Sequence, residues 1–309
     1  MAERSYGRAV ELAEDVRRVT CRNPSAMTSH GTESYLIGPR RGPVAVVDPG
    51  PDDPAHREAL MSEIGGAAVT AILVTHSHRD HSLGVPALRA LTGAEVLGFG
   101  AHGTGMSETM QRLAAASALG GGEGADTSFR PDRRLSDGAA VPVGEIRVTA
   151  LHTPGHLSNH LCFALEGRGI VFTGDTVMGW STTLVSPPEG DMAAFMGSLR
   201  RLAGRADRMF LPGHGDPVTE PARLLARQIA HREARAEQVR TVLAERPAAP
   251  RALTAQIYRD VDPKLWPAAE RNVLATLLWL METGEVAPEG ALAAEVPFRL
   301  VSQFGAVSD

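Results

Sequence analysis

Short apolar runs alternate with amphipathic segments along the first two thirds of the chain, and this pattern predicts a layered α/β domain. The run at residues 69–74 is almost entirely apolar, as expected of a strand that is buried on both faces. Further strands are predicted at 15–20, 34–37, 44–47, 146–151, 161–165 and 170–172, and helices at 54–64, 82–91 and 192–202.

An insertion at residues 103–138 interrupts this alternation. A helical pattern at about 108–118 runs into Gly120-Gly121-Gly122-Glu123-Gly124, and the backbone freedom of glycine predicts a mobile loop there. We expect such an insertion to cover a pocket.

The pattern changes again beyond Pro217. A long arginine-rich helix is predicted at 222–245, followed by helices at 253–258 and 268–282 and a strand-like run at 296–301. This order is that of a small winged-helix domain. We therefore divide the chain into a domain of residues 1–220 and a winged-helix-like domain of residues 221–309.

The charge of the chain limits its partners. The net charge is −5, so no overall field favours nucleic acid or an anionic membrane. Residues 221–309 carry 11 Arg and Lys and 11 Asp and Glu, which cancel. Strong binding of duplex nucleic acid is therefore not expected, and packing or formation of a homodimer are alternative roles for this domain.

The N-terminal residues contain no apolar stretch of the kind found in signal peptides, and no run approaches the ~18 apolar residues of a membrane span. We therefore expect a cytoplasmic protein without a membrane partner. Lys264 is the only lysine, and this preference for arginine, together with many alanines, is typical of a GC-rich bacterial genome.

Chemistry concentrates in Thr75-His76-Ser77-His78-Arg79-Asp80-His81, directly after the apolar run at 69–74. Four ligand-type side chains at the end of one strand converge on one place. Imidazole nitrogen and carboxylate oxygen suit zinc or a similar divalent ion, and the absence of thiolates argues against a closed structural zinc site.

Further ligand-type side chains follow other strand-like runs, each beside a glycine that lets the backbone turn tightly. They lie in Asp48-Pro49-Gly50, Thr153-Pro154-Gly155-His156, Thr173-Gly174-Asp175 and Pro212-Gly213-His214-Gly215. Each segment alone is typical of a plain turn. In this order after the histidine-rich run, they predict a shared pocket.

With these motifs, residues 15–217 resemble the metallo-β-lactamase superfamily. The resemblance implies an αββα sandwich and two metal ions, with Asp175 bridging them and Asp48 orienting a ligand. By this resemblance one metal is bound by His76, His78 and His156, and the other by Asp80, His81 and His214. The C-terminal part resembles the winged-helix-tailed branch, which includes lactamase-beta-2-type endoribonucleases.

Two such metals imply hydrolysis. Together with Asp80, Asp175 and a bridging hydroxide they leave a charge of about +1 in the pocket, and a hydroxide shared by two metals is a nucleophile near neutral pH. Zinc is the first expectation, with manganese or iron as alternatives.

The substrate is less defined by the sequence. A bridging Asp175 fits the phosphodiesterases and thioesterases of the superfamily, whereas its β-lactamases generally lack the bridge and are exported. We rank a phosphodiester first, as short single-stranded RNA or a small molecule. A thioester of the glyoxalase II kind is the alternative, and a non-catalytic interaction protein that retains the fold is a third reading.

Several other residues are candidates for the site. Asp80, as a ligand, and His160, as a proton donor or a contact to substrate, are the expected catalytic residues, although a structural, hydrogen-bonded His160 is an equal alternative. Trp180 and Ser181 follow the bridging aspartate and are expected to line the substrate pocket. His102 and Glu108, in the insertion, are expected to be solvated rather than catalytic.

Overall fold

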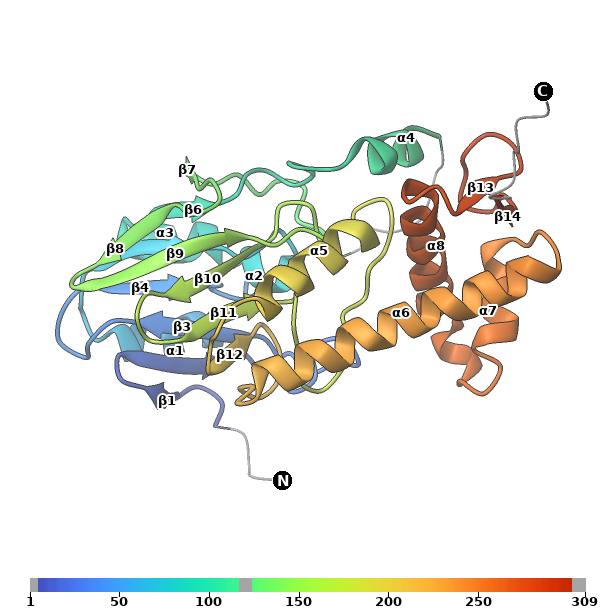
Figure 1. Cartoon of the computed structure of the whole chain (residues 1–309). Helices are drawn as coiled ribbons and strands as arrows, with labels where there is room; N and C mark the ends of the chain where they lie inside the picture. The colour runs from blue at the N-terminus through green and yellow to red at the C-terminus, as the bar shows by residue number, and fades with distance from the viewer. Residues whose placement is uncertain (1–4, 117–123, 302–309) are drawn as a thin grey trace.

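The computed structural model describes residues 5–116 and 124–301. Two β-sheets face each other and helices cover their outer faces, so the main body has four layers in the order αββα (Figure 1). A smaller group of helices, α7 and α8, with a two-stranded sheet lies at one end of this sandwich.

The first sheet has seven strands in sequence order. They are β1 (Ala9–Ala13), β2 (Val16–Thr20), β3 (Glu33–Ile37), β4 (Val44–Val47), β5 (Val69–Leu73), β6 (Glu95–Gly98) and β7 (Arg133–Arg134). The second sheet has five strands in the order β12-β11-β10-β9-β8. They are β8 (Ala140–Val143), β9 (Ile146–His152), β10 (Leu161–Leu165), β11 (Ile170–Gly174) and β12 (Met209–Pro212).

The helices of the main body are α1 (Pro54–Ile64), α2 (Arg79–Ser82), α3 (Val85–Thr92), α4 (Glu108–Ala116) and α5 (Met192–Ala203). The remaining elements are α6 (Pro221–Glu245), α7 (Pro250–Ile257), a 3₁₀ turn at Pro263–Leu265, α8 (Trp266–Glu282), β13 (Val286–Pro288) and β14 (Phe298–Leu300). None of the helices in the described part of the chain is long and apolar enough to span a membrane.

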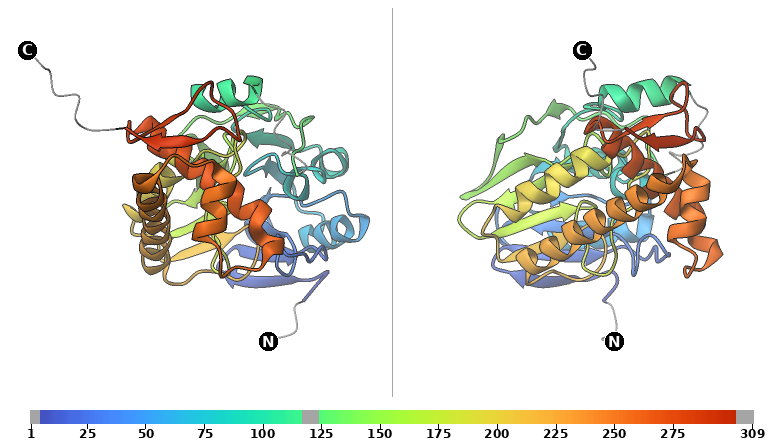
Figure 2. Two further views of the ribbon diagram at one scale, coloured as in Figure 1. Left: turned by 90° about the vertical axis from the view of Figure 1, so that its right-hand side faces the viewer. Right: turned by 45° about the vertical axis from the view of Figure 1, so that its right-hand side comes forward.

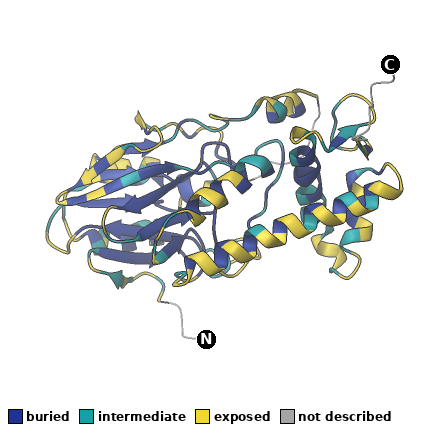
Figure 3. Cartoon of the chain, viewed as in Figure 1, coloured by how far each residue is buried: buried dark blue, intermediate teal, exposed yellow. Residues whose placement is uncertain are grey.

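Strands β4 and β10 are apolar throughout because both of their faces are covered. In β4, Ala45 and Val47 face the space between the sheets, whereas Val44 and Val46 pack under α1 and α3. In β10, Phe163 similarly faces the first sheet, while alternate residues pack toward α5. Successive strand side chains point to opposite faces, so a fully buried strand needs apolar residues at every position. Figure 3 shows these central strands as buried along their length.

One predicted helix is divided in the structure. The segment predicted as a helix at 82–91 begins at the last residue of α2 and ends within α3, and Gly84 lies between these two helices. The amide of Gly84 donates to the carbonyl of Gly50 at 2.9 Å, and a Cβ at Gly84 would lie 2.8 Å from the carbonyl oxygen of Pro49. The close approach of these two loops therefore requires glycine and separates the two helices.

Several strands were not predicted from the sequence, namely β1, β6, β7, β8, β12 and β13. Most contain only a few residues, and three include a proline, namely Pro142 in β8, Pro212 in β12 and Pro288 in β13. In so short a run the apolar pattern does not distinguish a strand from a turn. Their pairing with longer neighbours, such as β12 with β11, defines them.

The C-terminal helices and the small sheet share a core of their own. It contains Leu253, Leu277 and Phe298, together with Met110 and Leu113 from α4 in the insertion. The insertion thus packs partly on the C-terminal helices. Residues 120–123 of the glycine tract, which was expected to be mobile, lie outside the described residues.

Helix α6 contacts both parts of the molecule. Leu224 and Leu225, near its beginning, pack in the core under α5, whereas Val239 and Leu243, near its end, pack in the C-terminal core. Figure 2 shows α6 running from the sandwich to the C-terminal helices. The division at residue 220 stays a prediction, and α6 is the element that joins its two sides.

A buried arginine stabilises this junction. Arg232 of α6 donates to the carbonyl of Thr183 and, at 3.0 Å, to Oδ1 of Asn272 on α8. Its guanidinium also lies 5.4 Å from the ring centroid of Phe195 on α5. Burial lowers the pKa of Arg232 to about 10, which leaves it charged at neutral pH.

Replacing Arg232 is expected to destabilise the protein. Arg232→Met retains most of the volume but removes donors to two acceptors, so the free energy of unfolding should fall by about 2–4 kcal/mol. Arg227→Met, at an exposed position on the same helix, is the control and should change it by less than about 0.5 kcal/mol. Equilibrium denaturation in urea measures both, and equal stabilities of the two variants would contradict this role of Arg232.

Candidate metal centre

Seven histidine and aspartate side chains converge at one edge of the sandwich, where loops follow β5, β9, β11 and β12. They form two groups whose ligand-type atoms lie within 4.8 Å of one another. The first group is His76, His78, His156 and Asp175, and the second is Asp80, His81 and His214. These are the seven residues predicted as ligands from the sequence.

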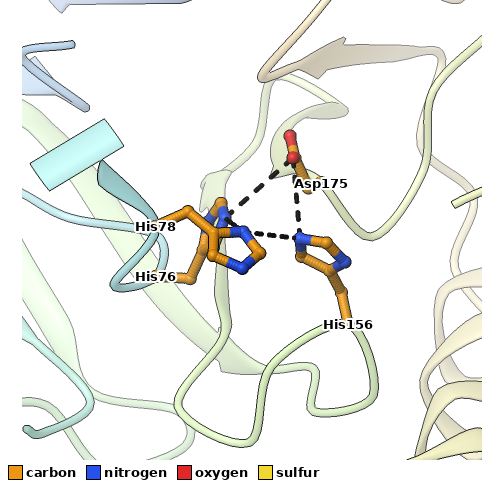
Figure 4. Close-up of side chains that lie close together, drawn as sticks. All are labelled: His76, His78, His156 and Asp175. Carbon is orange, nitrogen blue, oxygen red and sulfur yellow. Dashed lines mark hydrogen bonds and ion pairs between the residues drawn. The ribbon is translucent and has the colours of Figure 1, made fainter. Parts of the chain in front are cut away.

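In the first group, three imidazoles surround a common point. Nδ1 of His78 lies 3.0 Å from Nε2 of His76 and 2.9 Å from Nε2 of His156. Oδ2 of Asp175 lies 3.6 Å from Nε2 of His156 and 4.0 Å from Nε2 of His76. Figure 4 shows the three rings and the carboxylate turned toward one another.

The second group has the same spacing. Nε2 of His214 lies 3.3 Å from Nε2 of His81 and 3.2 Å from Oδ2 of Asp80. The Asp175 carboxylate also reaches this group, with Oδ1 3.6 Å from Nε2 of His81 and Oδ2 3.4 Å from Nε2 of His214. Asp175 therefore lies between the two groups, as a bridging ligand must.

These distances fit metal ions. Ligand atoms at 2.0–2.1 Å from a tetrahedral ion lie about 3.3 Å from one another, which is within the observed range of separations. The buried Oδ1 of Asp175 accepts no hydrogen bond from any of the described residues. A buried carboxylate oxygen without a donor requires a cation nearby, so the donor set and this oxygen both fit a pair of divalent ions.

Hydrogen bonds on the far side of the rings direct lone pairs into the site. Nδ1 of His156 donates to the carbonyl of Leu184 at 2.9 Å, and Nδ1 of His214 to the carbonyl of Gly31 at 3.1 Å. A carbonyl only accepts, so the proton is on Nδ1 and the Nε2 lone pair faces the cluster. Carbonyls thus fix these two rings in the form that binds metal.

Asp48, for which the resemblance implied a role in orienting a ligand, is connected to two more rings. Its carboxylate accepts from Thr75 Oγ1 at 2.7 Å and from His81 Nδ1 at 2.9 Å. Since the Thr75 hydroxyl gives its proton to Asp48, it accepts from Nδ1 of His76, 2.9 Å away. Asp48 thereby sets the tautomers of His81 directly and of His76 through Thr75.

The two groups differ in charge. Burial and neighbouring imidazoles, His156 first, lower the pKa of His78 to about 3. Burial also opposes protonation of His214, but the carboxylates of Asp175 and Asp80 outweigh it and raise its pKa to about 10. Burial disfavours the charged form of Asp175, yet His214 and His81 hold the pKa of this carboxyl well below its usual value. The carboxylates thus favour a second proton on His214, at the Nε2 lone pair for which a divalent ion would compete.

Two glycines let Asp175 enter between the groups. Gly174 has a φ of 46°, and a Cβ there would lie 2.6 Å from Nε2 of His160. A Cβ at Gly213 would lie 2.5 Å from Oδ1 of Asp175. Both contacts are too short for a side chain, so the loops that carry Asp175 and His214 require glycine at these positions.

His160 is a structural histidine in this arrangement. Its ring is fully buried, Nε2 accepts from the backbone amide of Asp175 at 3.1 Å, and Nδ1 lies 3.0 Å from Oγ1 of Thr153. Both ring nitrogens are therefore engaged away from the cleft. The structure favours the structural alternative over a proton donor, and His160 positions Asp175.

The expectation for Trp180 and Ser181 is corrected by the structure. Both line a separate pocket against α6, and neither lines the cleft that contains the metal-ligand candidates. The indole Nε1 donates to the carbonyl of His214 at 3.2 Å from outside the loop. Met178, three residues after Asp175, lines the cleft instead. The chain leaves the cleft after Met178, so Trp180 and Ser181 lie outside it.

The cleft over the two groups has a volume of about 540 Å³. Besides five of the ligand candidates, its walls include residues that sequence analysis did not identify. They are Met27, Thr28, Gly124, Leu157, Met178, Leu184, Ser186, Glu189, Pro267, Ala268 and Arg271. No sequence signal marked the α8 residues, because only tertiary packing places that helix beside the cleft.

His102, expected to be solvated rather than catalytic, is only partly exposed. Its side chain is 16% exposed, with Nδ1 3.0 Å from Oγ of Ser77 and Nε2 3.1 Å from Oε1 of Glu189. His102 thus connects the loop of the first group to the wall of the cleft. The sequence feature that could have indicated this position is that His102 lies in the loop after β6, whose neighbour β5 precedes the His76 run.

Fold and side-chain cluster together define an αββα protein with a site that could hold two metal ions and a winged-helix tail. A family model described as the metallo-beta-lactamase superfamily matches residues 28–214, and one for the beta-lactamase-associated winged helix domain matches residues 249–294. The chain belongs to the metallo-beta-lactamase superfamily, whose members are generally hydrolases. The predicted family and fold are confirmed.

Curated relatives resemble most of the chain. The Beta-lactamase-like protein 2 homolog of Drosophila melanogaster is 28% identical over 285 residues, covering 89% of this chain and 90% of the relative. An Atrochrysone carboxyl ACP thioesterase of Aspergillus fumigatus is 30% identical over 234 residues, covering 74% of this chain and 64% of the relative. The chain thus spans about two thirds of the length of this fungal relative.

Solved structures resemble the whole chain. A Beta-lactamase domain protein from Burkholderia ambifaria has a TM-score of 0.78 and 25% identity, covering 97% of this chain and 96% of the other. A metallo-beta-lactamase family protein from Thermus thermophilus has a TM-score of 0.71 and 24% identity, covering 93% and 99%. The sandwich and its C-terminal helices therefore recur together.

We expect the purified protein to hold two divalent metal ions per chain, because the two groups lie side by side and share Asp175. Elemental analysis of protein prepared without chelator measures the content, before and after addition of zinc or manganese. One ion or none after this addition would contradict the assignment of the second group.

Asp175→Asn should weaken the binding of both ions, since it keeps the shape of the side chain but removes the negative charge between two cations. Metal content should fall, and hydrolysis should decrease by ~10²-fold or more. Asp216→Asn is the matched control, because this exposed carboxylate lies two residues after His214 and outside both groups. Full metal content and rate in Asp175→Asn would exclude a bridging role.

Proposed function

We propose that the protein is a metal-dependent hydrolase of acyl thioesters, with zinc as the first choice of metal. The observation that carries the proposal is the lining of the cleft beside the candidate metal groups. This proposal reverses the order of substrates expected from the sequence, where a phosphodiester came first.

The wall of the cleft is largely apolar. Met27, Leu157, Met178 and Leu184 contribute side chains from four separate segments, and Pro267 of α8 adds a fifth. Apolar surface of this kind accommodates an acyl chain and excludes water from it. RNA would instead require several cationic side chains for its phosphates, whereas Arg271 is the only Arg or Lys among the described residues that line this cleft.

The similarity to proteins named as acyl-carrier thioesterases supports the same choice. One of them aligns with 74% of this chain. A thioester joins an apolar acyl group to a thiol, so one half of the substrate fits an apolar wall and the reacting carbonyl fits beside the metal groups.

The residues of this chain have separate roles in the proposed reaction. His76, His78 and His156 would hold one ion, Asp80, His81 and His214 would hold the other, and Asp175, which lies between the two groups, would contribute to both. Bound there, two divalent ions supply Lewis acidity, which activates water as a nucleophile and stabilises negative charge on the attacked carbonyl. Asp48, Thr75 and the carbonyls of Gly31 and Leu184 fix the imidazole rings. Preorganised ligands of this kind lower the cost of reorganisation during the reaction.

A phosphodiester remains the second candidate, because the same two groups can stabilise an attacking and a leaving oxygen. The tail is similar to a winged helix, but its lack of net positive charge gives no support for nucleic acid. Rates of hydrolysis of thioesters and phosphodiesters therefore have to be compared directly.

We expect the metal-loaded protein to hydrolyse the hexanoyl thioester of N-acetylcysteamine at least ~10²-fold faster, by kcat/KM, than bis-p-nitrophenyl phosphate or single-stranded RNA. Apolar contact with the acyl chain is the physical reason, and the acetyl thioester should be a poorer substrate, by ~10-fold or more, because each buried methylene contributes about 0.8 kcal/mol. Asp175→Asn serves as the background control. Faster cleavage of RNA than of every thioester would overturn the proposal.

A further inference from the structure

We propose that Arg271 on α8 is an anion-binding residue of the cleft and selects substrates that carry a carboxylate or phosphate group away from the reacting carbonyl. The inference rests on the proposed hydrolysis of thioesters for the identity of the substrate, but not for the binding of the anion. It assigns to the C-terminal domain a direct role in substrate recognition.

The position of Arg271 follows from the helix that carries it. Pro267, Ala268 and Arg271 all line the cleft, and their spacing of three and four residues places them on one face of α8. The same cleft is lined by His78, His156 and Asp175 of the candidate metal groups. A ligand in this cleft can therefore contact α8 and the metal groups together.

Most N–H donors of Arg271 form no hydrogen bond within the described chain. Its only hydrogen bond within the described chain is from Nη1 to the carbonyl of Pro187 at 3.4 Å, and no carboxylate of the described chain forms an ion pair with it. Glu189, the acidic side chain of the cleft wall outside the metal groups, is engaged with His102 at 3.1 Å. A guanidinium has five N–H donors in a planar fork, so several remain for a ligand.

The helix that carries Arg271 is held firmly against the site. The neighbouring residue Asn272 uses Oδ1 to accept from the amide of Val185 at 3.3 Å and from buried Arg232 at 3.0 Å. Arg232 in turn donates to the carbonyl of Thr183. These bonds join α6 and α8 to the loop whose Leu184 carbonyl orients His156. The guanidinium is therefore presented from a fixed helix, which lowers the entropic cost of binding an anion.

The chemistry of the partner follows from the fork of donors. Carboxylate and phosphate oxygens accept two parallel N–H bonds from one guanidinium, and a partly desolvated site strengthens them. Such an anion could stand on the acyl half of the thioester, as a terminal carboxylate, or on the thiol half, as the phosphate of a phosphopantetheine group.

Three thioesters of similar acyl length distinguish these sources. They are the pentanoyl and glutaryl thioesters of N-acetylcysteamine and the pentanoyl thioester of 4′-phosphopantetheine. Arg271→Gln should raise KM about 10- to 100-fold for at least one anionic thioester and less than about threefold for the neutral one, with kcat and metal content retained. Arg271→Lys should restore part of the loss, and Arg251→Gln, at an exposed position on α7, should change nothing.

The outcome assigns the anion or overturns the inference. A loss confined to the glutaryl thioester places the anion on the acyl half, and a loss confined to the phosphopantetheine thioester places it on the thiol half. An equal loss for all three, or no loss, overturns the role of Arg271. If the wild-type protein hydrolyses no thioester, the proposed function fails by itself. Calorimetric binding of glutarate and methyl phosphate to metal-loaded wild type and Arg271→Gln then tests the inference, and equal affinities overturn it.

Discussion

A buried carboxylate between two groups of imidazoles is the constraint on which the rest of the site depends. Asp175 is nearly inaccessible to water, and its Oδ1 accepts no hydrogen bond from any of the described residues. An anion in such surroundings is stable only beside positive charge. The neighbouring parts of the molecule serve to hold it there: Gly174 and Gly213 leave space for the loop, and His160 accepts the Asp175 amide. The site is therefore built around one charge, and the histidines are oriented toward it.

The sandwich places these groups at a single edge. Strands β4 and β5 are parallel neighbours in one sheet, and β11 and β12 are parallel neighbours in the other. The loops after them carry Asp48, the His76 run, Asp175 and His214, and the two sheets bring these loops face to face. Because the strands are fixed by an apolar core on both faces, the loop ends have little freedom, and polar groups far apart in the sequence meet within hydrogen-bond distance.

The C-terminal helices complete the site from outside the sandwich. Arg232 and Asn272 connect α6 and α8 to the loop at 183–185, and α8 supplies one wall of the cleft. Leu224 and Leu225 of α6 and Ala275 of α8 pack in the core with α5, and the charges of residues 221–309 cancel. The apolar wall, with Arg271 as its one Arg or Lys among the described lining residues, supports the proposed thioester over a phosphodiester.

The sequence by itself determined the family, the layered fold and the set of seven ligand candidates, because short-range patterns carry this information. Apolar runs such as 44–47 record burial on both faces, and His-x-His-x-Asp-His places ligands on one loop whatever lies around it. Only the tertiary structure decided where the side chains of His160, Trp180 and Arg271 lie relative to the site. Each of these depends on which distant segment packs against it: Asp175 against His160, the His214 loop against Trp180, and the metal cleft against α8. Contacts between segments far apart in the chain leave no periodic pattern in the sequence, so a side chain's direction toward or away from the site became visible only once the sheets and helices were packed together.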